Sequence, residues 1–489
     1  MKNMKMKKGL LALLALTLAL GAFAAPSMAE EPINLTWWVN CPGDVPVDAQ
    51  MVEDAANAVS KDTVGITATI MYKLADQMAL SLSAGEYYDM MFTCEWVSPN
   101  FIQNAYDGYY ADLTDLLPSL TPDLYATLDP VVWDAARVNG RIYAVPTKKD
   151  LASEMFWRLD SDFYEGELGW TIPEEVSFDE LETYLEAFKE NRPNEYAIFM
   201  SRNGLTNFTN FAQRVVGYYL VVPYEYAGTD KGTTIIPFYE YDELMHRYEL
   251  LHKWYTLGYI NPDAAVTESV TYANYSSVRS GQAWTGYTGW GKSSGHSVKI
   301  ARYDGPFMST ATMQGAMQAI NAGASQKNIE ASLKYMEYLS TDRSFRDILM
   351  YGVEGTHFNY LDNGTVLRTD QGRKNFLLDG FTHGSVAIAS VESSEDTLAD
   401  PLMWEKVYAG YDRASVSDLG GFAFNGEDYQ IELSAMNAVW DKYKYELQTG
   451  TSDPAVVIPQ LKAELESAGL LDVQKAAQAQ LDAYLESQR

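Results

Sequence analysis

The sequence predicts an α/β fold with more than one domain, on three observations. Strand-like and helix-like segments alternate near the N-terminus, which is typical of parallel sheets. The 489 residues exceed what a single hydrophobic core usually serves. In the stretch Asn139–Trp157 a strand-like run stops at Pro146, polar residues Lys148–Asp150 follow, and apolar residues then resume. We interpret this stretch as the first crossing from one lobe to the next; a surface turn between two strands is the alternative.

The first elements place four polar or aromatic residues at the ends of strands. Residues 33–40 alternate apolar and polar side chains and predict a strand; a helix is expected at 47–60, strands at 65–71 and 88–94, and a helix at 74–84. In open parallel sheets, ligands bind beyond the carboxyl ends of the strands. We therefore expect Asn40, Asp44, Glu95 and Trp96 on one rim.

Helix signals recur through the rest of the chain. Ser177 and Glu180 form a capping-box pattern for a helix that ends before Pro193. Periodic apolar residues predict further helices at 241–257 and 325–340, from Pro454 to Gly469, and from about 472 onward.

The N-terminal residues 1–29 read as a secretory signal peptide. Four lysines precede an apolar run, and the small residues Ser27-Met28-Ala29 predict cleavage after about Ala29. An uncleaved membrane anchor is the alternative, although the apolar run is short for a span. No lipobox cysteine follows the cut, so we expect an exported protein, periplasmic or extracellular. Cys41 and Cys94 are the two cysteines of the chain, and either a disulfide or two thiols fits the sequence.

Charge and histidine spacing limit the classes of partner. The net charge of −30 opposes binding to nucleic acid or anionic lipid and favours a soluble monomer. The five histidines show no metal-ligand spacing. We expect no metal and no cofactor.

Two catalytic patterns match by spacing alone. Residues 286–293, GYTGWGKS, fit the phosphate-loop pattern, and Gly291–Gly295 fits G-x-S-x-G with His296 beside it. No helical pattern follows either match, and a triad histidine would normally lie far along the chain. Both matches are interpreted as coincidental glycine-rich turns. Glu95 would be the candidate acid if the chain hydrolysed glycans.

Aromatic composition favours a sugar ligand. The chain has 34 Tyr, 11 Trp and 18 Phe, and rings with polar tips suit sugars, which stack through C–H groups and need partners for their hydroxyls. Most rings are expected to pack in cores, but four tryptophans end a strand or precede a glycine-rich turn: Trp38, Trp96, Trp284 and Trp290.

Several separated segments resemble a known family when taken in order. These segments are IYAVPTKKDLASEMFW (142–157), VRSGQAW (278–284), residues 317–342, MYGVEGTHF (350–358) and the tail from Leu419. Together they resemble the extracellular solute-binding proteins of carbohydrate-uptake ABC transporters (family 1 type). The tail is similar to the distinctive C-terminal domain of a long-chain branch, and it is the sharpest match.

The resemblance implies a two-lobed periplasmic-binding-protein type II fold with hinge crossings and a helical C-terminal extension. It implies one lobe of residues 30–146 plus 301–350 and a second of 147–300 plus 351–489, including the family domain at about 410–489. The residues that it implies for ligand binding are Trp38, Asn40, Asp44, Glu95, Trp96, Lys149, Asp150, Asn207, Phe208, Trp284, Trp290, Glu354 and Phe424.

The function implied is capture of a sugar or oligosaccharide and its delivery, without chemical change, to the permease subunits of an ABC importer. The chain would then not be an enzyme. A receptor of the same fold for a peptide or another small polar solute is the nearer alternative, because a fold does not fix its ligand. A secreted glycan hydrolase is the second alternative.

Overall fold

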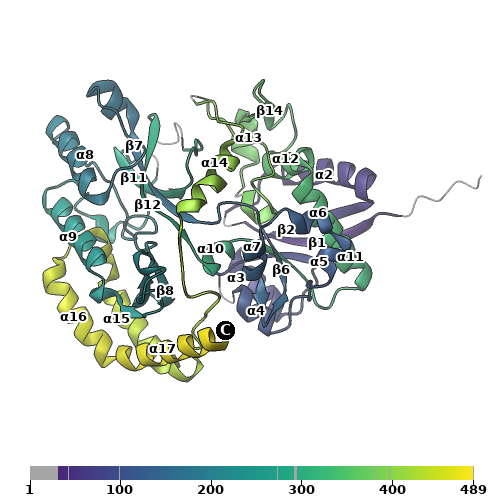
Figure 1. Ribbon diagram of the computed structural model, residues 1–489. Coiled ribbons are helices and arrows are strands. Elements are labelled where there is room, and N and C mark those ends of the chain that lie inside the picture. The colour runs from purple at the N-terminus through teal and green to yellow at the C-terminus, as the bar shows by residue number, and fades with distance from the viewer. Residues whose placement is uncertain are drawn as a thin grey trace, which may run out of the picture.

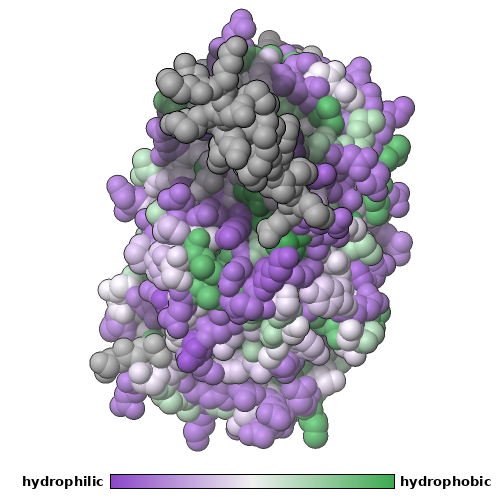
Figure 2. All heavy atoms as spheres, turned by 90° about the vertical axis from the view of Figure 1, so that its right-hand side faces the viewer, coloured by the Kyte–Doolittle hydropathy of each residue, from purple (hydrophilic) through white to green (hydrophobic). Residues whose placement is uncertain are grey.

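The computed structural model describes residues 31–487, except residues 42, 98–99, 272–273, 291–294, 379 and 396. The expected signal segment therefore lies outside the described residues, as do Lys292 and Ser293 of the two catalytic patterns. The chain forms two lobes, seen side by side in Figure 1. The end of the first lobe that faces the viewer in Figure 2 is mostly hydrophilic, with apolar residues scattered over it.

The first lobe is built on one five-stranded sheet. Its strands lie in the order β2 (Ile66–Lys73), β1 (Ile33–Asn40), β3 (Met90–Thr93), β13 (Met317–Ile320) and β6 (Ala144–Pro146). The parallel pairing of β1 with β2 and β3 confirms the N-terminal prediction. The strand β13, which follows a crossing from the second lobe, runs antiparallel to both of its neighbours, so the whole sheet is mixed.

Helices cover both faces of this sheet. Trp37 and Trp38 are consecutive in β1 and point to opposite faces, yet both are buried. Gly65, with φ +70°, ends α2 in the left-handed conformation that glycine tolerates. The helices of this lobe are α2 (Ala49–Val64), α3 (Ala75–Ser83), α4 (Phe101–Tyr106), α5 (Leu116–Leu120), α6 (Pro122–Ala126), α7 (Pro130–Ala135), α10 (Thr310–Met313), α11 (Gln326–Thr341) and α12 (Arg343–Tyr351), beside a hairpin of β4 (Arg137–Val138) and β5 (Arg141–Ile142).

The second lobe contains two sheets and five longer helices. One sheet has the order β11 (Val278–Ala283), β7 (Ser153–Asp160), β12 (Val298–Met308) and β16 (Ser415–Val416); the other has β10 (Ile236–Pro237), β9 (Leu220–Pro223) and β8 (Ala212–Val216). The helices are α8 (Phe178–Asn191), α9 (Asp242–Thr256), α15 (Gln430–Thr449), α16 (Pro454–Ser467) and α17 (Leu470–Ser487). The predicted capping box of α8 is confirmed, since the Glu180 N–H donates to Ser177 Oγ at 3.2 Å and the Ser177 N–H donates to Glu180 Oε2 at 2.8 Å.

A buried ion pair fixes α9 to the main sheet of this lobe. Arg247 donates from Nη1 and Nη2 to the two oxygens of Asp304 in β12, at 2.6 and 2.7 Å. The guanidinium also lies 3.8 Å from the centre of the Phe211 ring. The pair is therefore bidentate and covered by apolar side chains.

Residues 352–410 pack mainly on the first lobe. This segment holds β14 (Phe358–Tyr360), β15 (Val366–Arg368), α13 (Asp370–Asn375) and α14 (Met403–Gly410). His357 hydrogen-bonds Asp48 at 3.0 Å, and buried Arg346 donates to the carbonyl of Ser385 at 2.6 Å. These contacts differ from the division expected from the sequence, which groups residues 351–489 together.

The chain passes between the lobes three times. The first crossing is 147–152, between β6 and β7, and the second is 309–316, between β12 and β13. The third, 411–416, descends from α14 to β16 and the C-terminal helices (Figure 1). The second crossing begins later than residue 301, since β12 still pairs with β7 at Phe307. No helix within the described residues is long and apolar enough to cross a membrane.

Candidate functional site

One edge of the first sheet faces the second lobe. The carboxyl ends of β1, β3 and β6 meet there, together with the start of β13. The described segments at this rim are residue 41 with 43–48, 94–97, 147–152 and 309–316, and the last two are crossings. The sequence therefore predicted correctly that the segments after the first and third strands share a rim.

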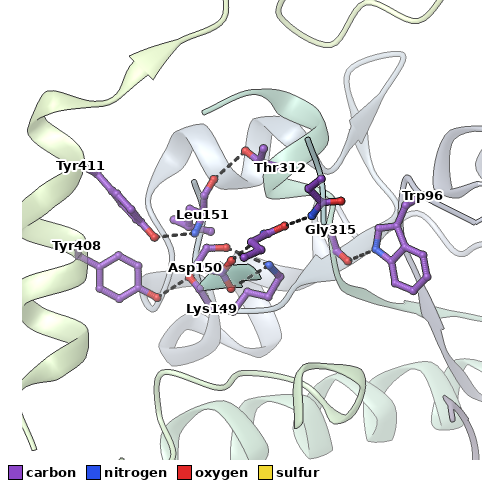
Figure 3. A network of polar contacts seen from close by, with 10 residues as sticks. Trp96, Lys149, Asp150, Leu151, Thr312, Gly315, Tyr408 and Tyr411 are labelled. Atoms are coloured by element: carbon purple, nitrogen blue, oxygen red, sulfur yellow. Dashed lines mark hydrogen bonds and ion pairs between the residues drawn. The ribbon is translucent and has the colours of Figure 1, made fainter. Parts of the chain in front are cut away.

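The first crossing is held on both sides by hydroxyl groups (Figure 3). Tyr408 donates to the carbonyl of Lys149 at 3.0 Å, and the Leu151 N–H donates to the Tyr411 hydroxyl at 2.9 Å. Thr312 of the second crossing donates to the carbonyl of Leu151 at 2.8 Å. Backbone groups of the first crossing thus form hydrogen bonds with Tyr408 of α14, with Tyr411 directly after α14, and with Thr312 of the second crossing.

A chain of polar side chains runs from this crossing into the second lobe. Lys149 Nζ lies 3.1 Å from Asp150 Oδ1, and both side chains are largely buried. Gln282 at the end of β11 contacts the other oxygen of Asp150 at 3.4 Å, and Asn207 donates to Gln282 Oε1 at 2.9 Å. Three of the residues predicted from the sequence are therefore linked, through Gln282, which was not predicted.

Trp96 offers an aromatic face at the rim. Its side chain is 50% exposed, and its Nε1–H donates to the carbonyl of Gly315 at 2.7 Å (Figure 3). The ring also lies 6.0 Å from that of Phe92, centre to centre. Because the polar tip is satisfied and one side packs on Phe92, the indole is held in place while much of it remains open.

Glu95 interacts electrostatically with residues of the second lobe. Burial raises the pKa of its carboxyl group, and the positive charge of Arg214 in β8 opposes that shift. Burial raises the pKa of Tyr224, just after β9, to about 12, and the charge of Glu95 contributes to that rise. Glu95 of the first lobe therefore interacts through its charge with Arg214 and Tyr224 of the second lobe. The sequence carried no signal for the latter two, since no motif surrounds them.

A second aromatic group follows β11. Trp284, Tyr287 and Trp290 lie in a row with ring centres 4.9 and 5.0 Å apart. Trp284 packs at 4.8 Å on Trp404 of α14 and is partly buried. Trp290 lies on Gly281, where a Cβ would come within 2.6 Å of the ring, so the contact requires glycine.

Three of the predicted ligand residues are buried or packed in cores instead. Trp38 is 1% exposed, with its ring 4.9 Å from Tyr88 and beneath Lys73 Nζ at 4.2 Å. Phe208 lies in the core of the second lobe, and Phe424 packs against the same core beside Tyr429. Burial keeps a ligand from the rings of Trp38 and Phe208, so these two predictions are wrong, whereas Phe424 is partly buried and its role stays a prediction.

The other predicted residues occupy varied positions. Asn40 is buried at the end of β1, whereas Asp44 and Glu354 are exposed, the first in the segment after β1 and the second in a turn before β14. Their roles stay predictions. Cys41 and Cys94 are buried free thiols. Within the part of the chain that is described, no three His, Cys, Asp or Glu side chains gather as a metal site would require.

Comparison with known proteins gives one domain match and several matches of nearly full length. Residues 418–486 match the family model of a domain of unknown function, DUF3502. A protein named "carbohydrate ABC transporter substrate-binding protein" from Streptococcus pneumoniae serotype 4 is 26% identical over 487 residues, covering 95% of this chain and 93% of that protein.

Solved structures agree with these matches. The N-glycan transport solute-binding protein NgtS from Streptococcus pneumoniae shares 26% identity and a TM-score of 0.81, covering 94% of this chain and 100% of that one. In complex with Man5GlcNAc, the same protein gives a TM-score of 0.70, covering 94% and 99%. The alginate-binding protein AlgQ2, at 18% identity and a TM-score of 0.57 over 93% and 98%, supports the fold alone.

The two lobes, their crossings, the match along almost the entire chain and the C-terminal domain agree with one another. Over almost its entire length the chain is thus similar to a carbohydrate ABC transporter substrate-binding protein and to an N-glycan transport solute-binding protein, and its C-terminal residues match DUF3502.

Proposed function

We propose that the chain captures a sugar or oligosaccharide between its two lobes and delivers it, chemically unchanged, to the permease of an ABC importer. The observation that carries the proposal is its similarity, over 94% of the chain, to a protein named as an N-glycan transport solute-binding protein. The expected partners are therefore a carbohydrate and membrane permease subunits, and we expect the receptor itself to be a monomer.

The rim has the chemistry that such a ligand needs. The open face of Trp96 can stack on the C–H face of a sugar, while Lys149, Asp150, Asn207 and Gln282 supply donors and acceptors for hydroxyl groups. These side chains come from both lobes. A ligand that bridges them gains contacts only when the lobes approach, which favours a closed form.

Comparison with the relative supports movement of this kind. This chain gives a TM-score of 0.81 with the NgtS structure whose name includes no glycan, but 0.70 and 0.73 with the Man5GlcNAc and Man1GlcNAc complexes. The identity is 26% and the coverage of this chain 93–94% in all three comparisons. The difference in TM-score therefore reflects a difference in shape among the three NgtS structures. We propose that the moving bodies in this chain are residues 31–146 with 309–410, and 153–308 with 417–487.

Export and the absence of catalysis belong to the same proposal. A signal peptide cut after about Ala29 would place the mature chain in a periplasm or outside the cell, where a permease could receive it. Glu95 would then be a binding residue, with Arg214 as its electrostatic counterpart. A glycan hydrolase would instead release new reducing ends from oligosaccharides incubated with the purified protein.

Thermal-shift measurements on the mature chain test the proposal. The panel comprises neutral and acidic mono- and oligosaccharides, polyols and short peptides. A ligand that binds the native state alone raises the Tm, because it adds to the free energy of unfolding. At a ligand concentration of 100 times the Kd, this addition is about 2.7 kcal/mol. We expect oligosaccharides to give the largest rises, with no new reducing ends. A rise with peptides alone, or turnover of the glycans, would contradict the proposal.

A further inference from the structure

A pocket of about 310 Å³ lies in the second lobe, beside the edge strand β11. It separates this strand from the segment 198–206, and it takes no part in the contacts at the crossings. The described residues that line it are Arg158, Ile198, Phe199, Met200, Ser201, Gly204, Leu205, Thr206, Val270, Thr271, Val278, Arg279 and Ser280.

The pocket is built into the backbone. The Val278 N–H donates to the carbonyl of Ala197 at 3.0 Å, and the Thr206 N–H donates to Ser280 Oγ at 2.7 Å. Between these two anchors the segment 198–206 bows away from β11. Gly204, with φ +69°, makes this path possible, and a Cβ there would collide with the carbonyl oxygen of Gln448 in α15. The C-terminal domain therefore holds the pocket wall in position.

Two arginines give the pocket a positive charge. Arg158 of β7 and Arg279 of β11 are directly paired across the two strands. No acidic residue is among the described residues that line the pocket, although the chain has a net charge of −30. Arg158 is largely buried with its guanidinium 4.6 Å from the centre of the Trp290 ring, and Arg279 donates to the carbonyl of Asn274. Both cations are thus held in place rather than free to reach into solvent.

We propose that this pocket receives one carboxylate-bearing sugar residue, a uronic or sialic acid, of the captured glycan. A guanidinium presents a planar set of donors that matches a carboxylate, and a partly desolvated cation attracts an anion strongly. Ser201, Thr206 and Thr271 add hydroxyl groups that can meet the hydroxyls of the same sugar. The inference rests on the proposed function, and it makes acidic glycans the preferred substrate class.

The size and position of the pocket favour a terminal or branching residue. Ligand pockets span roughly 300–1,000 Å³, so about 310 Å³ suits one sugar ring rather than a chain. Trp290 contacts Arg158 and lies on Gly281, two residues beyond Arg279. The neighbouring sugar of the glycan would therefore lie close to the Trp284–Tyr287–Trp290 row.

A glycan array followed by calorimetry tests this inference. The array carries neutral, carboxylate-bearing and sulfated oligosaccharides in matched sets. The strongest carboxylate-bearing binder is then titrated beside its carboxyl-reduced form, which differs from it only by a primary alcohol in place of the acid. We expect the acid form to bind at least about tenfold more tightly, equivalent to about 1.4 kcal/mol. R279Q and R158Q should each bring the two forms to similar affinity.

R202Q is the matched control, because Arg202 lies in the same lobe, pairs with Glu268 at 3.8 Å and does not line the pocket. It should keep the preference for the acid form. Circular dichroism melts show whether each variant is folded, and if R158Q is not, R279Q alone decides. Equal binding of the two forms, a preference for sulfated or neutral glycans, or an unchanged preference in R279Q would overturn the inference while leaving sugar capture intact. If no glycan bound at all, the proposed function would fail and the inference with it.

Discussion

Replacing Trp96 by alanine should separate ligand binding from folding. The indole is 50% exposed, so its removal takes away a ring face that solvent, and by our proposal a sugar, can reach. Two contacts support the ring from behind, the Nε1–H bond to the carbonyl of Gly315 and the packing on Phe92. The change therefore has one expected effect on affinity and a second, distinct effect on stability.

The sizes of both effects follow from these contacts. A net hydrogen bond contributes about 1 kcal/mol and an aromatic pair about 0.5–1.5 kcal/mol, so W96A should lower the free energy of unfolding by roughly 1.5–2.5 kcal/mol. W38A should cost more, about 3–5 kcal/mol, because Trp38 is 1% exposed and would leave a cavity. For binding, an aromatic anchor typically contributes about 1–3 kcal/mol, or roughly 5- to 150-fold in Kd.

Calorimetry with the tightest oligosaccharide from the thermal-shift panel measures the loss of affinity, and urea unfolding measures the stability. W96F keeps a ring but loses the hydrogen bond, so it should recover part of the affinity. W170A is the control, because Trp170 is a partly buried ring that packs on the core of the second lobe. If folded W96A bound the glycan within twofold of wild type, Trp96 would not be a stacking residue and the description of the rim would be wrong.

Two further predictions concern stability. R247M leaves Asp304 buried without its bidentate partner, so urea unfolding should show a loss of about 3–5 kcal/mol; an unchanged midpoint would mean that the pair contributes little. Burial, aided by the charge of Arg346, lowers the pKa of His383 to about 3, so between pH 6.5 and 3 the unfolded chain binds a proton that the native state does not. Stability should therefore fall as the pH falls through this window, by up to about 1.4 kcal/mol per pH unit from this residue. H383Q lacks this group, so only the wild type loses this part of its free energy of unfolding as the pH falls. The difference in free energy of unfolding between wild type and H383Q should therefore be smaller at pH 4.5 than at pH 7. An equal difference at the two pH values would refute the assignment to His383.

The sequence predicted the regular elements and the shared rim because these depend on local patterns. Apolar alternation identified β1 from end to end, and the capping residues located the start of α8. Glu95 and Trp96 were predicted to lie at the rim because the carboxyl ends of parallel strands lie at the same edge of a sheet.

Other features depend on contacts between distant segments, which a pattern cannot reveal. Trp38 was misjudged because alternation does not tell whether one or both faces of a sheet are covered. Arg214, Tyr224 and Gln282 were missed, since only the assembled lobes place them near Glu95 and Asp150.

The third crossing affects how the molecule can bend. Two connecting segments let the lobes rotate about a shared axis and restrain twisting only weakly, whereas a third connection adds resistance to torsion. Here that third connection is fastened at its lower end, where Thr310 donates to the carbonyl of Gly420 at 2.6 Å and the Gly421 N–H donates to the Tyr484 hydroxyl at 3.0 Å. Tyr484 belongs to α17, so this helix anchors the segment that follows the third crossing. Removing α17 should therefore make the connection between the lobes more flexible, even though none of its side chains lies at the rim.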